Sequence, residues 1–294
     1  MPCIKSALKS AANSLAAYSE SSVLDSEVLL CKVLETSRTY LRTWPDKPLT
    51  AHQLSNFEAL IAKRQQGVPI AYLIGSREFW SRDFSVTSAV LIPRPDTECL
   101  IELSLQLIPP NKPVKIIDLG TGSGIIAITL AAERPQAQLS ATDISLLALH
   151  VAQLNAQKHH THIQFYQSDW FANVPEGKFD IIVSNPPYIA ADDSHLQTGD
   201  LRFEPQQALV ASDQGLRDIK IIAESARYYL EIGGYLLIEH GYNQEQQVQA
   251  IFNHSGYHKI QTYQDLSGQP RVTVGYNPIS KDSTHDLKRN PNPA

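Results

Sequence analysis

The chain has 294 residues, with 25 Lys or Arg and 30 Asp or Glu, so its formal net charge is −5. This balance argues against a strongly cationic surface for duplex DNA or RNA, and no apolar stretch approaches the roughly 18 residues of a membrane span. Cys3, Cys31 and Cys99 are far apart, which indicates reduced, buried thiols, and the sequence near Met1 lacks a secretory signal, so we expect a cytoplasmic protein.

The first part of the chain, residues 4–66, shows apolar residues at helical spacing. Thr50 and Gln53 form a capping box that opens one of these helices, and Gly67 is placed to end it. We therefore expect residues 1–69 to form a small helical bundle that serves as a substrate-docking domain.

A change of period follows. Residues 70–93 carry aromatic and β-branched residues broken by Gly75 and Ser85, a pattern that predicts a β-hairpin linker. Pro93 and Pro95 end this segment, and a helix is expected from Asp96 or Thr97.

From residue 114 onward, strands and helices alternate, which predicts an α/β sheet with helices on both faces. The expected strands are 114–118, 138–143, 163–167, 180–184, 234–239, 258–264 and 271–276. The expected helices are 125–132, 146–157, 216–230 and 244–253. The last two strands lack a long connecting helix, which suggests an antiparallel edge. We assign this domain to residues 94–276, and we expect the polar segment 277–294 to be a disordered tail.

The loop Asn185-Pro186-Pro187-Tyr188 directly follows the buried strand and offers hydrogen-bond acceptors with few donors. Pro186 and Pro187 have no backbone N–H, so their carbonyls are free to face a ligand. Asn185 adds an amide oxygen, and Tyr188 adds an aromatic face. Such a loop suits a planar NH2 group, either of a base or of a carboxamide. The structural alternative is a rigid exit from the strand.

A glycine turn, Gly120-Thr121-Gly122-Ser123-Gly124, closes the first strand of this domain and opens a helix. It lets backbone approach a ligand at a helix N-terminus. Ile125 stands where a dinucleotide fingerprint needs Gly or Ala, so that fingerprint fails. The turn instead looks like the first motif of class I S-adenosylmethionine methyltransferases. A glycine turn without a ligand is the alternative.

Acidic and aromatic residues follow the next two strands. Asp143 can accept hydrogen bonds from ribose hydroxyls. Asp169 can hydrogen-bond the adenine N6, and Trp170 can pack on the adenine ring. Taken singly, Asp143 could be a helix cap and Trp170 a core residue. Their positions at successive strand ends favour a shared ligand, because ligands bind outside the carboxyl ends of such strands.

The chemistry suggested by these residues needs alignment more than a base. A carboxamide nitrogen is a poor nucleophile, but attack on a sulfonium methyl lets the proton leave afterwards. Acceptors at Asn185 and Pro186 would fix the amide plane and stabilise the charge that develops on N–H, and alignment can account for about 7–11 kcal/mol. We read His159, His160 and His162 as solvated, and we expect no metal site.

The chain resembles the HemK/PrmC family of release factor glutamine methyltransferases over about residues 5–276. The stretches that carry this likeness are 67–72, 77–80, 91–98, 118–124, 168–171, 185–188, 202–205 and 271–272. Asn-Pro-Pro-Tyr is shared with adenine-N6 methyltransferases, whereas Leu-Ile-Pro-Arg-Pro-Asp-Thr-Glu is far more specific.

The resemblance implies a Rossmann-like class I methyltransferase sheet. It also implies methyl transfer from S-adenosylmethionine to N5 of the glutamine in the Gly-Gly-Gln loop of peptide chain release factors. Gly120–Gly124 would hold the methionine part of the donor, Asp143 the ribose and Trp170 the adenine. Asn185–Tyr188 would hold the glutamine amide, with Asn185 touching both ligands. We expect a monomer that needs neither nucleic acid nor a membrane.

Three other functions stay open from the residues alone. A nucleic-acid (adenine-N6) methyltransferase would need a recognition domain with interleaved basic and aromatic residues, and residues 1–66 hold only scattered basic ones. A glutamine methyltransferase of a ribosomal protein would use the same acceptor loop. A non-catalytic donor-binding subunit would have no need of the Asn185–Tyr188 loop.

Overall fold

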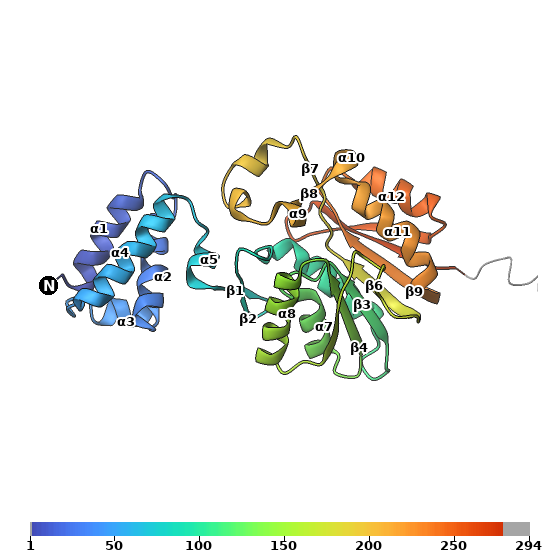
Figure 1. The fold of residues 1–294 in the computed structure, drawn as a ribbon, viewed down its shortest axis with the longest axis horizontal. Coiled ribbons are helices and arrows are strands. Elements are labelled where there is room, and N and C mark those ends of the chain that lie inside the picture. The colour runs from blue at the N-terminus through green and yellow to red at the C-terminus, as the bar shows by residue number, and fades with distance from the viewer. Residues whose placement is uncertain (1, 279–294) are drawn as a thin grey trace, which may run out of the picture. The chain divides into compact units, whose positions relative to one another are not determined.

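The computed structural model describes residues 2–278, which divide into two compact units (Figure 1). One unit contains the residues up to 77 together with 85–88 and 194–204. The other contains 78–84, 89–193 and the residues from 205 onward. The functional division of the chain at residues 69 and 93 stays a prediction.

The first unit is a bundle of short helices around an apolar core. Its helices are α1 (Ile4–Leu15), α2 (Ser22–Leu34), α3 (Arg38–Thr43), α4 (Ala51–Gln65) and α5 (Ile70–Ile74). The expected capping box begins α4, where Gln53 N donates to Thr50 Oγ1 over 3.2 Å and Thr50 N donates to Gln53 Oε1 over 3.0 Å. The helical character predicted for residues 4–66 is confirmed.

A buried ion pair joins two helices of this unit. Arg64 Nε donates to Asp25 Oδ2 over 2.8 Å, and the exposed fractions of the two side chains are 15% and 7%. Asp25 also accepts hydrogen bonds from the Ser19 and Ser21 hydroxyls. Arg64 Nη1 also lies 3.8 Å from Asp200 Oδ1, but Asp200 is half exposed, so Asp25 is the nearer and more buried counter-charge.

Asp25→Ala should therefore lower the free energy of unfolding by about 3–5 kcal/mol, because it leaves the Arg64 guanidinium buried without its carboxylate. Urea unfolding followed by circular dichroism measures this loss. Arg42→Ala is the control, since Arg42 is 68% exposed and lies 3.8 Å from Glu27, and such surface pairs contribute about 0–1 kcal/mol. Equal effects of the two substitutions would contradict the structural role of Asp25.

The predicted hairpin is present but shorter than expected. Strands β1 (Ser76–Phe79) and β2 (Arg82–Ser85) form a two-stranded sheet. Residues 70–74 form helix α5 instead of strand, so that part of the prediction was wrong. Tyr72 N and Leu73 N both bond the Pro69 carbonyl, each over 3.1 Å. Proline suits a helix start, and five apolar residues are too few for their period to distinguish helix from strand.

The second unit is built on a seven-stranded sheet in the order β10-β11-β9-β6-β3-β4-β5. Its strands are β3 (Lys115–Leu119), β4 (Gln138–Asp143), β5 (Ile163–Gln167), β6 (Phe179–Ser184), β9 (Leu230–Glu239), β10 (His258–Gln264) and β11 (Pro270–Tyr276). β11 runs antiparallel to β10 and β9, and the other neighbours are parallel. The mixed α/β fold with an antiparallel edge is thus confirmed.

Helices cover both faces of this sheet (Figure 1). On one face lie α6 (Glu98–Leu107), which follows the 3-10 turn η1 (Pro95–Thr97), α7 (Ile125–Glu133) and α8 (Leu146–Lys158). On the other lie α11 (Arg217–Tyr229) and α12 (Glu245–His254). Neighbouring strand residues point to opposite faces, so Ile116 joins the first core cluster and Ile117 the second. Because β5, β4, β3, β6 and β9 run parallel, their carboxyl ends meet at one edge of the sheet.

Short elements fill residues 189–215, for which the sequence predicted no secondary structure. They are β7 (Ile189–Ala190), η2 (Ser194–Gln197), η3 (Leu201–Phe203), α9 (Gln206–Leu209), β8 (Val210–Ala211) and α10 (Ser212–Gly215). β7 and β8 pair in parallel. The segment directly after the acceptor loop is thus folded and ordered by its own contacts.

Three smaller expectations are met only in part. Asn277 is buried, and its backbone N donates to Gly234 O over 2.8 Å, so it packs against the sheet and is not part of a tail. Residues 279–294 lie outside the described residues. The three thiols are free, but each is partly exposed instead of buried. Between residues 2 and 278, no helix is both long and apolar enough to cross a membrane.

Candidate active site

A cavity of about 350 Å³ lies at the carboxyl ends of the parallel strands. Among the predicted site residues, Gly120–Ser123, Asp143, Asp169, Trp170, Asn185 and Pro187 line it. A larger hollow of about 780 Å³ is lined by residues at the opposite strand ends, such as Lys115 and Gln138. Only the smaller cavity brings the glycine turn and the acceptor loop together.

The glycine turn is preformed by hydrogen bonds. Thr121 Oγ1 donates to Asp118 Oδ2 over 2.6 Å, Thr121 N donates to Thr142 O over 2.8 Å, and Asn155 Nδ2 donates to Ser123 O over 2.9 Å. Burial raises the pKa of Asp118 to about 7, although the Thr121 hydroxyl acts against this rise. The turn therefore exposes backbone to the cavity without needing a ligand to shape it.

Gly124 does not line the cavity, although the sequence placed it there. A Cβ at this residue would lie 2.7 Å from Ile128 Cδ1 and 3.2 Å from Ala152 Cβ. Its lack of a side chain lets α7 pack closely on α8. Gly120, in contrast, faces the cavity, and a Cβ there would meet the Trp170 ring at 3.3 Å.

Asp143 links the turn to the end of β4. Its Oδ2 accepts from Gly122 N and its Oδ1 from Ser145 N, both over 2.9 Å. Burial raises the pKa of this carboxyl, while these backbone bonds act in the opposite direction. Each carboxylate oxygen retains a lone pair, so Asp143 can still accept hydrogen bonds from two hydroxyls in the cavity.

Trp170 has a left-handed backbone, with φ at 46°, which is unusual for a bulky residue and typical of functional sites. A hydrogen bond from its side chain lowers the pKa of Asp218, against the larger effect of burial. Asp218 and Arg217 also line the cavity, and the sequence did not point to either. Asp169, next to Trp170, lines the cavity as expected.

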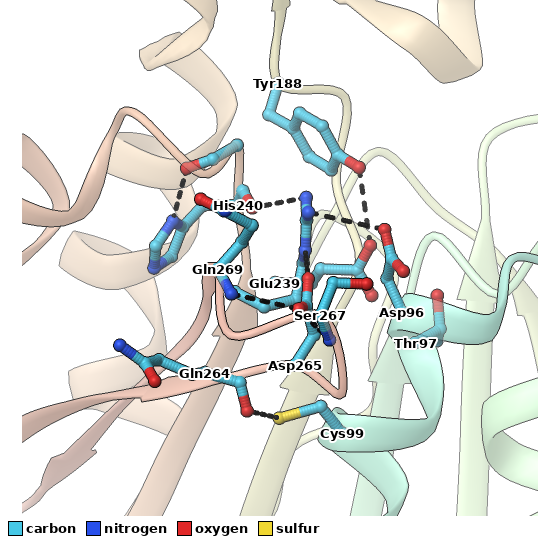
Figure 2. A network of polar contacts seen from close by, with 12 residues as sticks. Asp96, Thr97, Cys99, Tyr188, Glu239, His240, Gln264, Asp265, Ser267 and Gln269 are labelled. Carbon is cyan, nitrogen blue, oxygen red and sulfur yellow. Dashed lines mark hydrogen bonds and ion pairs between the residues drawn. The ribbon is translucent and has the colours of Figure 1, made fainter.

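The acceptor loop is divided between the cavity and the interior. Ser184 Oγ donates to Leu119 O over 2.8 Å, which ties the end of β6 to β3. Asn185 and Pro187 line the cavity, whereas Pro186 is buried and Tyr188 turns its hydroxyl inward, 3.4 Å from Glu239 Oε1. Burial raises the pKa of Tyr188. Figure 2 shows this inward orientation.

Two further segments that the sequence did not assign to the site contribute to the cavity wall. Val90, Pro93, Arg94 and Thr97 come from the stretch before α6, and Pro205, Gln207, Ala208 and Val210 come from the segment after η3. Neither segment follows a strand of the main sheet, so the positions of the strand ends did not point to it. Among the described residues no group of three or more His, Cys, Asp and Glu could hold a metal ion.

The arrangement can bind a nucleoside beside a flat polar group. Asp143, Asp169 and Trp170 offer acceptors and an aromatic ring at one end, and the glycine turn offers backbone in the middle. Asn185 stands at the other end of the same cavity. A donor held by the turn would thus place its reactive group next to the acceptor loop.

Comparisons with known proteins agree with this geometry. Residues 101–217 match the model of the methyltransferase small domain, and residues 6–75 match that of the PrmC N-terminal domain. A methyltransferase from Pyrococcus furiosus shares the fold, with a TM-score of 0.53 and 16% identity over 76% of this chain and all of that one.

Two curated relatives are much closer in sequence, and both are named release factor glutamine methyltransferase. The protein from Shewanella oneidensis is 47% identical over 93% of this chain and 96% of its own length. The protein from Vibrio cholerae is 48% identical over 92% and 96%. With nearly half of all residues identical over almost the whole of both chains, this chain belongs to the family of release factor glutamine methyltransferases.

Proposed function

We propose that this protein transfers a methyl group from S-adenosylmethionine to the side-chain amide N5 of the glutamine in the Gly-Gly-Gln loop of peptide chain release factors. The observation that supports this most is one cavity that contains both the glycine turn and Asn185, in a chain of this family. We further propose that it acts in the cytoplasm as a monomer, without nucleic acid, and tunes translation termination.

S-adenosylmethionine is the methyl donor, and it supplies an activated methyl group on a sulfonium. The residues present fit it: the turn is open and preformed, and both Asp143 oxygens retain acceptor capacity. We assign Gly120–Ser123 to its methionine part, Asp143 to its ribose, and Asp169 with Trp170 to its adenine. Gly124 supports the turn from behind.

The acceptor loop would hold the glutamine amide. Asn185 Oδ1 would accept one N–H bond, and Pro187 would flank the side chain, since both residues line the cavity. We assign the second N–H bond to the Pro186 carbonyl and a flanking role to the Tyr188 ring, although neither residue lines the cavity and Pro186 is buried. These acceptors orient the nitrogen and stabilise its developing charge, so the proton can leave to water after transfer. The helical unit, residues 1–69 in our division, would dock the release factor.

The proposed function is tested with labelled methyl donor and purified release factors whose loop glutamine is intact or replaced. Label should appear only on the factor with the glutamine. Duplex DNA and ribosomal proteins serve as alternative acceptors. Label on either of these, and none on the release factor, would replace the proposal with one of the other two functions.

The ribose role of Asp143 can be tested separately. Asp143→Ala should weaken donor affinity about 10–100-fold, because hydrogen bonds to a charged group contribute about 1.5–3 kcal/mol. Isothermal calorimetry measures the dissociation constant. Asp180→Ala is the control, since Asp180 Oδ2 accepts from Lys115 N over 2.8 Å at the other end of the sheet. An unchanged dissociation constant in Asp143→Ala would exclude the ribose role.

A further inference from the structure

A chain of polar contacts leads from Asn185 into the protein. Asn185 Nδ2 donates to Thr97 Oγ1 over 3.2 Å. Thr97 is 1% exposed, and although it precedes α6, its side chain makes no cap hydrogen bond. Behind it lies the carboxylate of Glu239, which is 1% exposed at the end of β9. Figure 2 shows Thr97 and Tyr188 on either side of Glu239.

Glu239 needs donors from its neighbours. The Tyr188 hydroxyl reaches Oε1, whereas Oε2 makes no hydrogen bond of ordinary length among the described residues. An unsatisfied buried carboxylate oxygen strongly favours any donor that can turn toward it. Figure 2 shows Thr97 close to the Glu239 carboxylate, so we infer that its hydroxyl is the donor that turns toward Oε2. A hydrogen bond from Thr97 also lowers the pKa of Glu239.

These contacts determine which end of the Asn185 amide faces the cavity. A threonine hydroxyl has a single hydrogen. If that hydrogen points to Glu239, the Thr97 oxygen can only accept from Asn185, so Nδ2 turns inward and Oδ1 faces the cavity. In the reversed amide, Thr97 would have to donate to Asn185 Oδ1, and Glu239 would lose its donor.

We propose that Thr97 and Glu239 are positioning residues that hold the Asn185 amide with its oxygen toward the reacting glutamine. This inference rests on the proposed function, because it explains how the acceptor loop presents an oxygen and not an N–H to the substrate amide. An N–H at that place would repel the NH2 group of the substrate. Thr97 and Glu239 act through Asn185, and Tyr188 shares the same carboxylate.

The Glu239 carboxyl acts purely as an acceptor in its ionised form. Burial raises its pKa to about 7, and the nearby Arg271 guanidinium lowers that pKa while Asp96 raises it. Arg271 is itself held by Asp265, with Nε 3.0 Å from Oδ2, and by Asp96 at 3.3 Å. Assays at about pH 8.5 therefore keep the Glu239 carboxyl ionised, since the group loses its proton as pH rises through its pKa.

The test compares Thr97→Val, which keeps the shape and removes the hydroxyl, with Thr97→Ser, which restores it. Thr97→Val should lower kcat on release factor by about 10–100-fold, as loss of a supporting contact and small misplacement do. The donor dissociation constant should stay within about threefold, and Thr97→Ser should recover kcat to within about threefold of the wild type. Glu239→Gln should also lower kcat, because the glutamine amide can donate to Thr97. The Thr97 hydroxyl can then donate to Asn185 Oδ1, which reverses the direction of the hydrogen bonds and turns that oxygen away from the cavity.

Ser104→Ala is the matched control. It removes a buried hydroxyl from α6 that donates to Leu100 O over 2.7 Å, within its own helix. Its kcat should equal that of the wild type. Wild-type kcat in Thr97→Val, or failure of Thr97→Ser to recover, would overturn the inference, as would a parallel loss of donor binding. If the wild type itself did not methylate release factor, the proposed function would fail instead.

Discussion

Asn185→Ala is expected to lower methyl transfer to release factor by about 10²–10³-fold, the effect typical of removing one preorganised polar contact to a reacting centre. The donor dissociation constant should change much less. The residue lies at the end of β6, where it lines the cavity and donates inward to Thr97. Alanine removes the oxygen that would align the glutamine nitrogen, while the glycine turn and Asp143 are left unchanged.

Single-turnover transfer of labelled methyl, together with calorimetry of donor binding, separates these two effects. Asn173→Ala is the matched control, because the exposed Asn173 amide donates to Gln167 O over 3.0 Å, outside the cavity. It should match the wild type in both measurements. Wild-type turnover in Asn185→Ala would remove this residue from the mechanism. An equal loss of donor affinity and turnover would make it a donor-binding residue only.

The sheet could be predicted from the sequence because its signals are local. Residues 181–183 form a short continuous apolar run, as buried parallel strands do, and turn residues follow at its carboxyl end. Parallel strands bring their carboxyl ends to one edge, so the sequence alone predicts that Gly120, Asp143, Trp170 and Asn185 share a cavity. The structure places all four there.

The support of those residues could not be predicted, because it depends on contacts between distant segments. Glu239 ends its strand as an ordinary polar residue, and nothing in its neighbourhood in sequence shows that it lies beneath Tyr188. Thr97 was expected to start a helix and does precede α6, but the sequence did not show that its hydroxyl also accepts from the Asn185 amide. Tyr188 was expected to offer an aromatic face, yet its hydroxyl points inward, because its nearest acceptor comes from the adjacent strand β9.

The segment 205–215 was missed for a different reason. It has no period, and Asp213 and Gln214 both adopt left-handed backbone conformations, with φ at 56° and 53°. Such a turn leaves no pattern in hydrophobicity. Its position becomes clear only from Gln244, whose Nε2 donates to Tyr188 O over 3.0 Å and to Gln214 O over 3.1 Å. One side chain thus fixes both the acceptor loop and the turn that packs on it.

Gly215 is the last residue of that turn, and its substitution by alanine is expected to lower methyl transfer strongly. A Cβ at this position would lie 2.0 Å from Tyr188 O and 2.6 Å from Tyr188 C, and its φ is +81°. Because the contact is with backbone, no side-chain rotation can relieve it. Gly215→Ala must push the Tyr188 carbonyl away from Gln244, and the Asn185 side chain three residues earlier moves with the loop. A displacement near 1 Å at a reacting centre can cost about 10²-fold in rate, so we expect kcat on release factor to fall by about that factor.

Gly268→Ala separates the effect of the clash with Tyr188 from the cost of placing a side chain on a left-handed backbone. Gly268 has nearly the same conformation, with φ at +76°, but nothing lies within 4 Å of where its Cβ would be. Both substitutions should lower the free energy of unfolding by about 1–2 kcal/mol for placing a side chain on a left-handed residue. Gly215→Ala should lower it further, because its Cβ also clashes with the Tyr188 backbone. Only Gly215→Ala should also lose turnover at a temperature where both variants are folded, with donor binding in both close to the wild type. If kcat fell equally in the two variants, the loss would reflect general destabilisation, and the rigid support of the acceptor loop by residues 213–215 would not be needed for transfer.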